Sequence, residues 1–478
     1  MRGVPGAALV TIGPGAANAV TGAAQAYVDS SALFIISGQA GSRLLRYEQE
    51  TGIRQHGTQS LNLEPMVSSI TKYFAAVLDP ADIRYHMERA YFEAVNGRRG
   101  PVWIDVPVDI QNKQVPQIMR AFVSAEVKSA QETANLQDVS ETMRTVSNTV
   151  LLEDAISKAL EKVADSRKPL LLVGGGADKK TVAAVTQKLH IPVVTSRMGI
   201  DRIASDDPYY VGRIGAYGQR AAHFAVQQAD VLLILGCRLS VSSIGYYPER
   251  FGENAFKIQA DLDQKELDKP DVPIDLKLCM STEGFAKKLL TLEPLACDEW
   301  AAYCRNLRDR YPVVTEEYLR CNPLNSYYFT ELLSRMAPEN AAVVVDTGSV
   351  CNVASQAWHL KKEQRFLVSG GLSCMGFWAG AIGCCGGDVP VLALSGDGSV
   401  SMNIQEFATL MYHHFPLKLF VYQNHGYMLI RHNQHNYMED RFLGVGEDSG
   451  LKTPDYCRVA AAYGLPSVRI SYGDDIEA

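Results

Sequence analysis

The sequence predicts an α/β protein made of three doubly wound parallel-sheet domains, of which the outer two are incomplete. Short, nearly continuous apolar runs rich in Val, Ile and Leu recur along the chain, and such runs are typical of parallel strands covered on both faces. Stretches with a helical pattern separate these runs, as in βαβ units. The chain has 478 residues, which is long for one hydrophobic core and favours about three domains.

The first block, residues 1–112, is predicted to be an N-terminal domain. It contains a helical pattern over Asn18–Tyr27. Its strands are predicted at Ala7–Thr11, Leu33–Ser37 and Val102–Val106. Residues 113–150 are polar and carry no sustained strand pattern, so we predict a connector there.

Two further blocks show the same alternation. Residues 151–295 are predicted to be a central Rossmann-like domain, residues 296–322 a helical linker, and residues 323–478 a C-terminal domain. The central strands are predicted within Pro169–Gly176, Ile191–Thr195 and Val231–Gly236. The C-terminal strands are predicted at Val343–Val345, Val391–Ser395 and Leu417–Tyr422.

Both ends of the chain are predicted to be cut. The first block opens almost directly on a strand, with too few elements before Gly13 for a complete sheet. The chain stops at Ala478 shortly after Pro466–Ser471, where one more helix and strand would normally finish a doubly wound domain. Met1 is therefore consistent with an internal methionine.

Composition excludes several classes of function. The chain is 47% hydrophobic and 21% charged, as in ordinary globular proteins. Its net charge of −7 is spread out without a basic tract, so we expect no nucleic-acid partner. It has neither a membrane-length apolar run nor a signal-peptide pattern, so we expect no membrane association. The ten cysteines are scattered, which predicts reduced and mostly buried thiols in a cytoplasmic protein and no zinc site.

Two polar residues close successive apolar strands of the third block. Asp397 follows the strand Val391–Ser395, and Asn424 follows the strand Leu417–Tyr422. A helical stretch, Ile404–His413, separates the strands, so both carboxyl ends are expected at one edge of a parallel sheet. An acidic oxygen and an amide oxygen beside glycines suit a hard cation that carries phosphate oxygens. The sequence therefore predicts a magnesium site at this edge.

Taken alone, Gly396-Asp397-Gly398 is equally well explained as a tight turn. The second strand, which ends in Asn424 after 25 intervening residues, favours the metal site. This spacing resembles the motif of thiamine-diphosphate enzymes, Gly-Asp-Gly followed about two dozen residues later by Asn-Asn. Gln423 stands here in place of the first Asn, which leaves the presumed ligand Asn424 intact.

The resemblance covers nearly the whole chain and is closest to the acetolactate synthase-like branch of these enzymes. The segments that carry it are Leu9–Gly15, Asn18–Gly22, Ile36–Gln39, Arg99–Pro107, Asp346–Gly348, Ser369–Gly376 and Gly396–Asn403. It implies thiamine diphosphate and Mg²⁺ as cofactors, with Asp397, Asn424 and the main-chain oxygen of Gly426 as metal ligands. The residues it places against the cofactor are Asp346, Gly348, Ser349, Met375, Gly396, Gly398, Ser399, Met402 and Tyr427.

The two methionines have different predicted partners. By resemblance, Met402 supports the bent shape of the cofactor, and Met375 packs against its pyrimidine. Judged by residue type alone, a methionine near a strand end is more often core filler. Asn403, with Glu406 three positions later, carries the signature of a helix N-cap, and we favour that role over catalysis.

Further candidates lie in the first two domains. By resemblance, Gln59 reaches the thiazolium side of the pocket as a catalytic residue, whereas a loop glutamine taken alone is usually just solvated. His56 and His425 are candidate proton relays. The central block contains Gly174–Gly176 and Gly236–Leu239, and by resemblance the Gly-x-Arg part of the second segment contacts FAD in the flavin-containing synthases, although Leu239 and Ser240 replace the Phe-Asp expected there. Glycine turns after buried strands explain them equally well, so FAD stays open.

The resemblance implies decarboxylation of a 2-keto acid, with pyruvate as the expected donor, followed by carboligation to a keto acceptor. The segments Ile430–Gln434 and Gly348–Gln356 are closer to synthase-like enzymes of sugar or secondary metabolism, so another acceptor stays open. A dimer or a tetramer of dimers is expected. The family also uses a glutamate that no residue of this chain matches. A non-catalytic cofactor-binding homologue is therefore the alternative, and turnover by this chain alone is expected to be poor.

Overall fold

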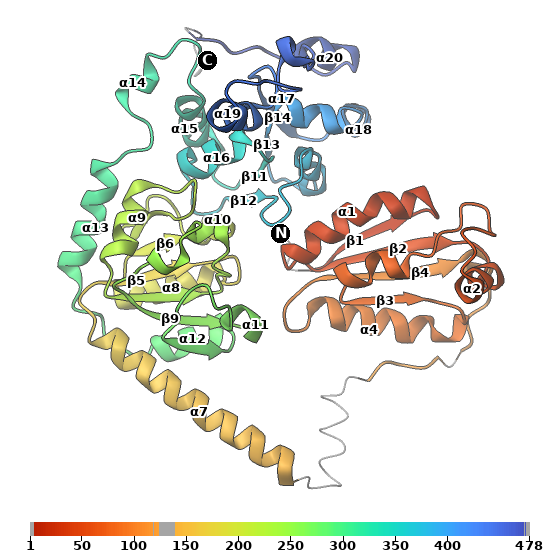
Figure 1. The fold of residues 1–478 in the computed structure, drawn as a ribbon, viewed down its shortest axis with the longest axis horizontal. Coiled ribbons are helices and arrows are strands. Elements are labelled where there is room, and N and C mark those ends of the chain that lie inside the picture. The colour runs from red at the N-terminus through yellow and green to blue at the C-terminus, as the bar shows by residue number, and fades with distance from the viewer. Residues whose placement is uncertain (1–3, 118, 124–138, 473, 475–478) are drawn as a thin grey trace. The chain divides into compact units, whose positions relative to one another are not determined.

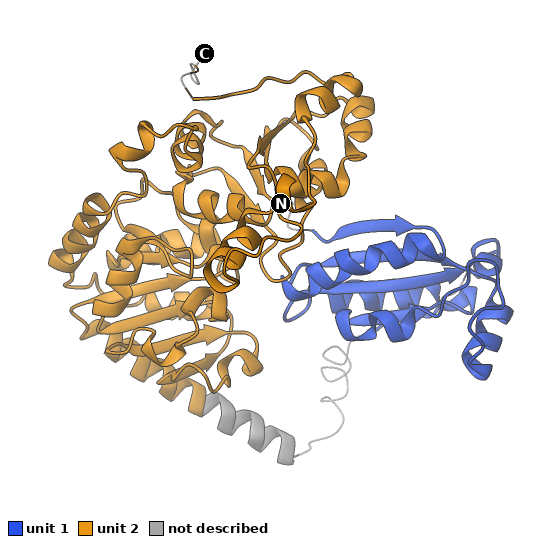
Figure 2. Cartoon of the chain, turned by 45° about the horizontal axis from the view of Figure 1, so that its top comes forward, with its two compact units in different colours: residues 1–147 blue, residues 148–478 orange. Residues whose placement is uncertain are grey.

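The computed structural model describes residues 4–117, 119–123, 139–472 and 474, with the backbone alone described for 139–150. The chain forms two compact units, residues 1–147 and residues 148–478 (Figures 1 and 2). The predicted connector, 113–150, lies in part outside the described residues, at 118 and 124–138. Helix α7, Val139–Ala164, begins after this gap.

Unit 1 is built on a four-stranded parallel sheet with the strand order β1-β2-β4-β3. The strands are β1 Gly6–Val10, β2 Leu33–Gln39, β3 Tyr73–Ala76 and β4 Pro101–Pro107, and the helices are α1 Pro14–Val28, α2 Ser42–Thr51, α3 Glu64–Val67, α4 Ile83–Val95 and α5 Val108–Gln111. Helix α1 packs on the face that carries Ile35 and Trp103, and α4 packs on the opposite face, with Phe34 and Ile104. This two-sided cover explains why these strands read as continuous apolar runs.

The three strands predicted in unit 1 are confirmed within two residues at each end. Helix α1 begins at Pro14, earlier than the predicted Asn18, with the proline in the first turn, where its missing N–H is no loss. Strand β3 was not predicted, because its four residues include two alanines.

A buried carboxyl group joins the two central strands of unit 1. Asp105 accepts hydrogen bonds from Ser37 Oγ at 2.6 Å and Gln39 Nε2 at 2.8 Å, and Trp103 Nε1 donates to the same Ser37 oxygen at 2.8 Å. Burial raises the pKa of Asp105 from 3.8 to about 6, because the two hydrogen bonds offset only part of the desolvation.

We expect Asp105 to reduce the stability of unit 1 as the pH rises from about 4 to about 6. In this window the folded state keeps the Asp105 proton while the unfolded chain releases it, so the folded state binds more protons. The loss is on the order of 3 kcal/mol and stays constant above the folded pKa. The measurement is urea unfolding by pulse proteolysis, for the wild type and Asp105→Asn, across this range. Parallel pH curves for the two proteins would contradict the expectation.

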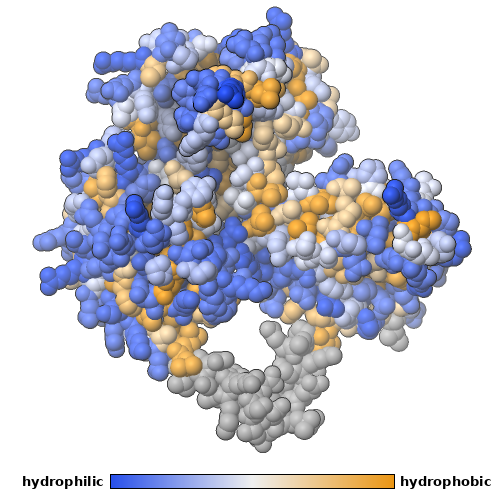
Figure 3. Space-filling model, viewed as in Figure 1, coloured by the Kyte–Doolittle hydropathy of each residue, from blue (hydrophilic) through white to orange (hydrophobic). Residues whose placement is uncertain are grey.

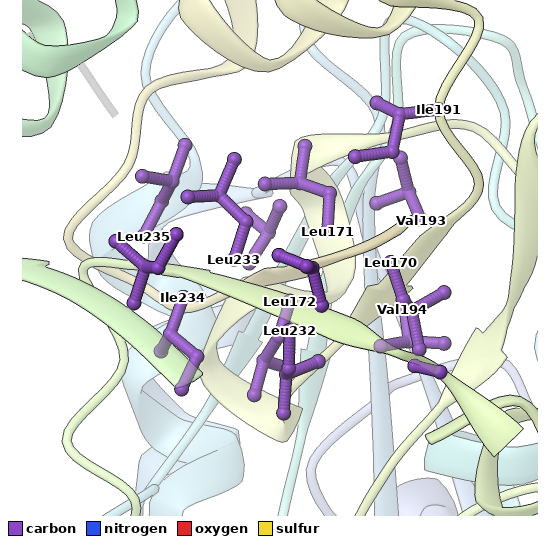
Figure 4. Packing of buried hydrophobic residues seen from close by; sticks show 14 of the residues in the cluster. Leu170, Leu171, Leu172, Ile191, Val193, Val194, Leu232, Leu233, Ile234 and Leu235 are labelled. Atoms are coloured by element: carbon purple, nitrogen blue, oxygen red, sulfur yellow. The ribbon is translucent and has the colours of Figure 1, made fainter. Parts of the chain in front are cut away.

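The central part of unit 2 is a six-stranded parallel sheet with the order β10-β9-β8-β5-β6-β7. Its strands are β5 Pro169–Val173, β6 Val193–Thr195, β7 Tyr210–Arg213, β8 Val231–Leu235, β9 Phe256–Asp261 and β10 Leu276–Cys279, and its helices are α8 Lys179–Leu189, α9 Arg220–Gln228, α10 Val241–Ile244, α11 Gln264–Leu267 and α12 Thr282–Leu289. The predicted strands correspond to β5, β6 and β8. Figure 4 shows leucines of the neighbouring strands β5 and β8 within this buried cluster.

The chain then passes through α13, Asp298–Arg310, and α14, Glu316–Leu319. Helix α13 lies within the stretch predicted as a linker, and it packs Trp300, Cys304 and Leu307 into the core of the central sheet. Trp300 Nε1 also donates to the carbonyl of Pro169 at 2.9 Å.

The C-terminal part of unit 2 is a four-stranded parallel sheet with the order β12-β11-β13-β14. Its strands are β11 Ala342–Val345, β12 Arg365–Val368, β13 Val391–Gly396 and β14 Leu417–Tyr422, and its helices are α15 Ser326–Met336, α16 Ser349–Ala357, η5 Phe377–Cys384, α17 Asp397–Val400, η6 Ser401–Asn403, α18 Glu406–His413, α19 Met428–Tyr437 and α20 Tyr456–Ala462. The chain therefore contains three parallel α/β sheets, and the predicted fold class is confirmed.

Hydrophilic residues cover most of the face in Figure 3, and among the described helices none is both long and apolar enough to cross a membrane.

The ten cysteines are free thiols, as predicted, but only Cys237, Cys297, Cys304 and Cys351 are buried, so the prediction of mostly buried thiols is wrong. Burial raises the pKa of Cys304 to about 12, which makes this thiol unreactive.

Candidate metal and diphosphate site

Asp397 and Asn424 lie at the same edge of the C-terminal sheet. Strands β13 and β14 pair in parallel register, with Gly396 opposite Tyr422. Asp397 directly follows β13, and Asn424 lies two residues beyond the end of β14. The predicted placement of the two residues at one carboxyl edge is confirmed, and this edge is where open α/β sheets bind their ligands.

The carboxylate of Asp397 is fully buried and has only neutral hydrogen-bond donors around it. Gly398 N donates to Oδ1 at 2.9 Å, and Gly426 N and Thr453 Oγ1 donate to Oδ2 at 3.2 and 3.1 Å. Within the described part of the chain, Asp397 forms no ion pair. A buried negative charge without a cationic side chain is costly unless it binds a metal ion.

Asn424 supplies a second oxygen at this place. Its side-chain Oδ1 is buried and accepts no hydrogen bond. Buried polar oxygens in native proteins are nearly always satisfied, so such an atom indicates a missing ligand. A carboxylate oxygen and an amide oxygen are hard ligands of the kind that Mg²⁺ prefers. The two residues therefore fit a magnesium ion that completes its coordination with phosphate oxygens.

The loop after Asn424 requires glycine. Gly426 has φ of +139°, and a Cβ there would lie 2.1 Å from the carbonyl oxygen of Val445. Arg431 Nη2 fixes the same loop by donating to the carbonyls of His425 and Val445, both at 3.1 Å. The main chain of Gly426 is thus held against Asp397, and its carbonyl as the third metal ligand stays a prediction.

The predicted diphosphate residues differ in their surroundings. A Cβ on Gly398 would lie 2.4 Å from the ring of Tyr427, so these two residues pack against each other. At Gly396 and Gly348 a Cβ would meet open space, but Gly348 has φ of +93°, which itself favours glycine, so only Gly396 has no explanation within the chain. A closely approaching ligand would explain Gly396. Ser399 is buried in the short helix α17.

The carboxylate of Asp346 connects several elements of the site through hydrogen bonds. This fully buried carboxylate accepts hydrogen bonds from Ser395 Oγ at 2.8 Å and from the backbone N–H groups of Thr347, Phe377 and Trp378 at 2.8, 3.1 and 3.2 Å. Burial raises the pKa of Asp346, and these hydrogen bonds oppose the shift. Asp346 therefore ties β11, β13 and η5 together beneath Gly348 and Ser349, where α16 begins. Its contact with the diphosphate stays a prediction.

Met402 and Met375 project from this edge instead of filling the core. Their side chains are 47% and 40% exposed. Asn403 Nδ2 donates to the carbonyl of Gly376 at 2.7 Å. This hydrogen bond joins the segment that carries Met402 to the segment that carries Met375. The prediction that Asn403 caps the following helix is wrong: α18 begins after Gln405, and its N-terminus has no side-chain cap.

The segment Gly371–Gly383 contains no charged residue, and part of it packs inside the C-terminal domain. Trp378 and Ala381 are completely buried in the core with Val344 and Phe407. Leu372 remains 43% exposed. The lack of charge in this segment is thus explained partly by packing within the C-terminal sheet.

Gln59 lies in unit 1, on an exposed loop beside the N-terminus of α1. It adopts a left-handed backbone with φ of +58°, and a Cβ on Gly13 would lie 2.6 Å from its carbonyl oxygen. His56 is exposed and its ring contacts Tyr47. The catalytic role of Gln59 stays a prediction.

Glu48, in α2, orders the loop that carries Gln59 and was missed by sequence reasoning. Its buried carboxylate accepts hydrogen bonds from His56 N at 2.6 Å, Gly57 N at 2.8 Å and Ser60 Oγ at 2.7 Å. Burial works to raise the pKa of Glu48, but these hydrogen bonds outweigh it and lower the pKa. No sequence signal marks this role, because it depends on how the loop folds back on the helix.

The glycines considered for FAD are explained by contacts within the central sheet. Strands β5 and β8 are neighbours, and a Cβ on Gly174 would lie 2.0 Å from the carbonyl oxygen of Gly236. Gly176 N also donates to Gly236 O at 3.0 Å. The two main chains pack directly on each other, so the glycines are required whether or not a flavin binds.

Among the described residues, no group of three or more His, Cys, Asp or Glu side chains is placed to hold a metal ion. A metal held by the protein alone is thus not indicated there. The arrangement of Asp397 and Asn424 instead suits an ion that is shared with a phosphate-bearing ligand.

Comparison with known proteins agrees with this arrangement. Three family models match: "Thiamine pyrophosphate enzyme, C-terminal TPP binding domain" over residues 346–478, the corresponding central domain over 156–289, and the N-terminal TPP binding domain over 1–66. Thiamine pyrophosphate is another name for thiamine diphosphate.

Similar proteins extend along the entire chain. Acetolactate synthase 2, chloroplastic, of Zea mays is 30% identical over 501 residues, which cover 99% of this chain and 72% of that protein. Acetolactate synthase 1, chloroplastic, of Nicotiana tabacum is 29% identical over 494 residues, covering 100% and 70%. The acetolactate synthase isozyme 2 large subunit of Escherichia coli (strain K12) is 28% identical over 491 residues, covering 100% and 81%. The chain therefore belongs to the thiamine pyrophosphate enzyme family, as an enzyme of the acetolactate synthase type.

Proposed function

We propose that this protein holds thiamine diphosphate through Mg²⁺, decarboxylates a 2-keto acid and joins the remaining fragment to a keto acceptor. Pyruvate is the proposed donor. The observation that carries the proposal is the meeting of two buried side-chain oxygen ligands at one sheet edge. The carboxylate of Asp397 is buried without a cation, and Oδ1 of Asn424 is buried without a donor. A magnesium ion bound to a diphosphate satisfies both.

The residues of the chain have separate roles in this proposal. Asp397, Asn424 and the carbonyl of Gly426 hold the ion, and the open space at Gly348 and Gly396 admits the diphosphate. The amides at the start of α16 favour a negative group, because a helix N-terminus carries a partial positive charge.

The remaining proposed residues act on the organic part of the cofactor and on the substrate. Met402 and Met375, both partly exposed at the edge, provide apolar surface for the rings of the cofactor. Gln59 takes part on the substrate side, as the family resemblance implies. When bound, thiamine diphosphate supplies the nucleophilic carbon and the electron sink that decarboxylation requires.

Two further parts of the proposal rest on the family alone. By analogy with the family, we expect a homo-oligomer, and light scattering measures the molar mass of the purified protein in solution. FAD remains a candidate second cofactor, although packing of Gly174 against Gly236 explains those glycines without it. The visible absorbance of the purified protein shows whether a flavin is present.

The test separates binding from turnover. Thiamine diphosphate is titrated into the protein by calorimetry, once with Mg²⁺ and once with a chelator. Carbon dioxide release from pyruvate is then measured with both cofactors, and the products are identified with pyruvate alone and with added keto acceptors. Binding that requires Mg²⁺, together with carbon dioxide release, supports the proposal. Binding without turnover favours the non-catalytic homologue, and no binding with Mg²⁺ contradicts the proposal.

A further inference from the structure

Arg213 is a buried cation at the end of β7, in the central sheet. It is 2% exposed. Its Nη1 donates to the carbonyl of Ser355 at 2.8 Å, and its Nη2 donates to the carbonyl of Trp358 at 2.8 Å. Its Nε has no hydrogen-bond partner, and among the described residues it forms no ion pair. Such a burial is costly, and an apolar side chain of similar volume would fill the place without that cost.

Both acceptors of Arg213 belong to the C-terminal end of α16. This helix ends at Ala357, and the carbonyls of its last turn have no partner within the helix. Gln219 Nε2 satisfies another of them by donating to the carbonyl of Gln356 at 2.8 Å. The central sheet thus holds the last turn of α16 with one cation and one amide. A cation at this end also compensates the negative end of the helix dipole.

The opposite end of α16 begins at Gly348 and Ser349, two of the proposed diphosphate residues. The helix has nine residues and almost all of its side chains are buried, so a shift of its last turn moves its first turn as well. We propose that Arg213 is a positioning residue: it acts through α16 to hold the first-turn amides in place for the diphosphate. This inference rests on the proposed function, because it takes the diphosphate to bind at that end.

The chain offers a matched control at the same boundary between the central and C-terminal sheets. Arg365 Nε contacts Asp201 Oδ2 at 2.6 Å, and so it also joins the two sheets. Arg365 lies at the start of β12, and its side chain bonds to Asp201 instead of to α16. Arg365→Met therefore shows the effect of breaking a contact between the two sheets that does not involve α16. A positioning role predicts that Arg213→Met alone alters the first turn of α16.

The experiment has one readout with the cofactor and one without. In cofactor-free protein, hydrogen exchange is measured at Cys351 N and Asn352 N, which bond to Gly348 O in the first turn. Affinity for thiamine diphosphate with Mg²⁺ is measured by calorimetry. In Arg213→Met we expect faster exchange at both amides and binding weaker by at least about tenfold, because two charge-assisted hydrogen bonds are lost. Arg213→Lys, which keeps the charge, should recover part of the affinity, and Arg365→Met should match the wild type in both readouts.

A second variant keeps the test decisive if Arg213→Met does not fold. Gln219→Glu keeps one side-chain oxygen, which accepts from Arg213 N at 3.0 Å. Its second oxygen replaces the amide nitrogen that donates to the carbonyl of Gln356, so that hydrogen bond is lost. This variant should loosen the same turn and weaken binding in the same direction.

Unchanged exchange and affinity in the Arg213 or Gln219 variant overturn the inference, as do equal losses in Arg365→Met. If the wild type itself does not bind thiamine diphosphate, the proposed function fails. Exchange at Cys351 and Asn352 then decides the link between Arg213 and the first turn by itself.

Discussion

Replacing Asp397 by Asn is expected to abolish Mg²⁺-dependent cofactor binding while changing the stability of the cofactor-free protein only slightly. Two effects on stability oppose each other. The variant removes a buried charge that has no cationic partner, but its amide nitrogen faces the donors Gly426 N and Thr453 Oγ1. We expect the net change in unfolding free energy to stay within about 2 kcal/mol.

The expected loss of affinity is much larger. Removing a residue that only orients a metal ligand typically costs about 10- to 100-fold in metal affinity, so removing the ligand itself should cost about 100-fold or more. Calorimetry with thiamine diphosphate and Mg²⁺ measures this loss, and urea unfolding without cofactor measures the stability. Asp388→Asn is the matched control, because Asp388 is exposed in the turn before the same strand, at its other end. Wild-type affinity in Asp397→Asn would remove this edge from the proposal.

Met402→Ala is expected to impair function far more than folding. Met402 is 47% exposed, so truncating it should cost less than about 1 kcal/mol of stability, whereas a methionine in the core costs about 2–5 kcal/mol. If Met402 supports the bound cofactor, the same truncation should lower affinity or turnover per loaded molecule by at least about tenfold.

Thermal unfolding and cofactor titration of the same preparations separate the two roles of Met402. Met411→Ala is the control, since Met411 lies on α18 and is exposed to a similar degree, 41%. We expect this control to keep both its melting temperature and its function. A large drop in melting temperature for Met402→Ala, with normal turnover of the folded fraction, would show that Met402 belongs to the core.

The sequence predicted the site edge because two strong signals coincide there. Strands β13 and β14 are continuous apolar runs, and a crossover helix between parallel strands leaves their carboxyl ends together. Asp397 and Asn424 were therefore placed correctly from spacing alone. The longer strands β2, β4, β5 and β8 were predicted for the same reason.

Sequence reasoning failed where tertiary contacts decide the structure. Strand β9, Phe256–Asp261, places buried Lys257 and Gln259 among its apolar residues, so its pattern breaks the continuous run. The local signal for an N-cap at Asn403 was overridden by its hydrogen bond to Gly376, 27 residues away in the chain. Arg213 and Glu48 carry no pattern at all, because their partners, mostly main-chain groups, are brought to them only by folding.

Asp397 is also bound to the last helix of the described chain. Its main-chain carbonyl accepts a hydrogen bond from the hydroxyl of Tyr456, at the start of α20, and its Oδ2 accepts from Thr453. Ser401 Oγ lies 2.7 Å from the same tyrosine hydroxyl. A metal ion held by the Asp397 carboxylate would compete with the Thr453 hydroxyl for the lone pairs of that carboxylate. It would also restrain the main chain of Asp397. Binding of the ion should therefore change how readily a protease cuts the segment between Gly450 and Tyr456.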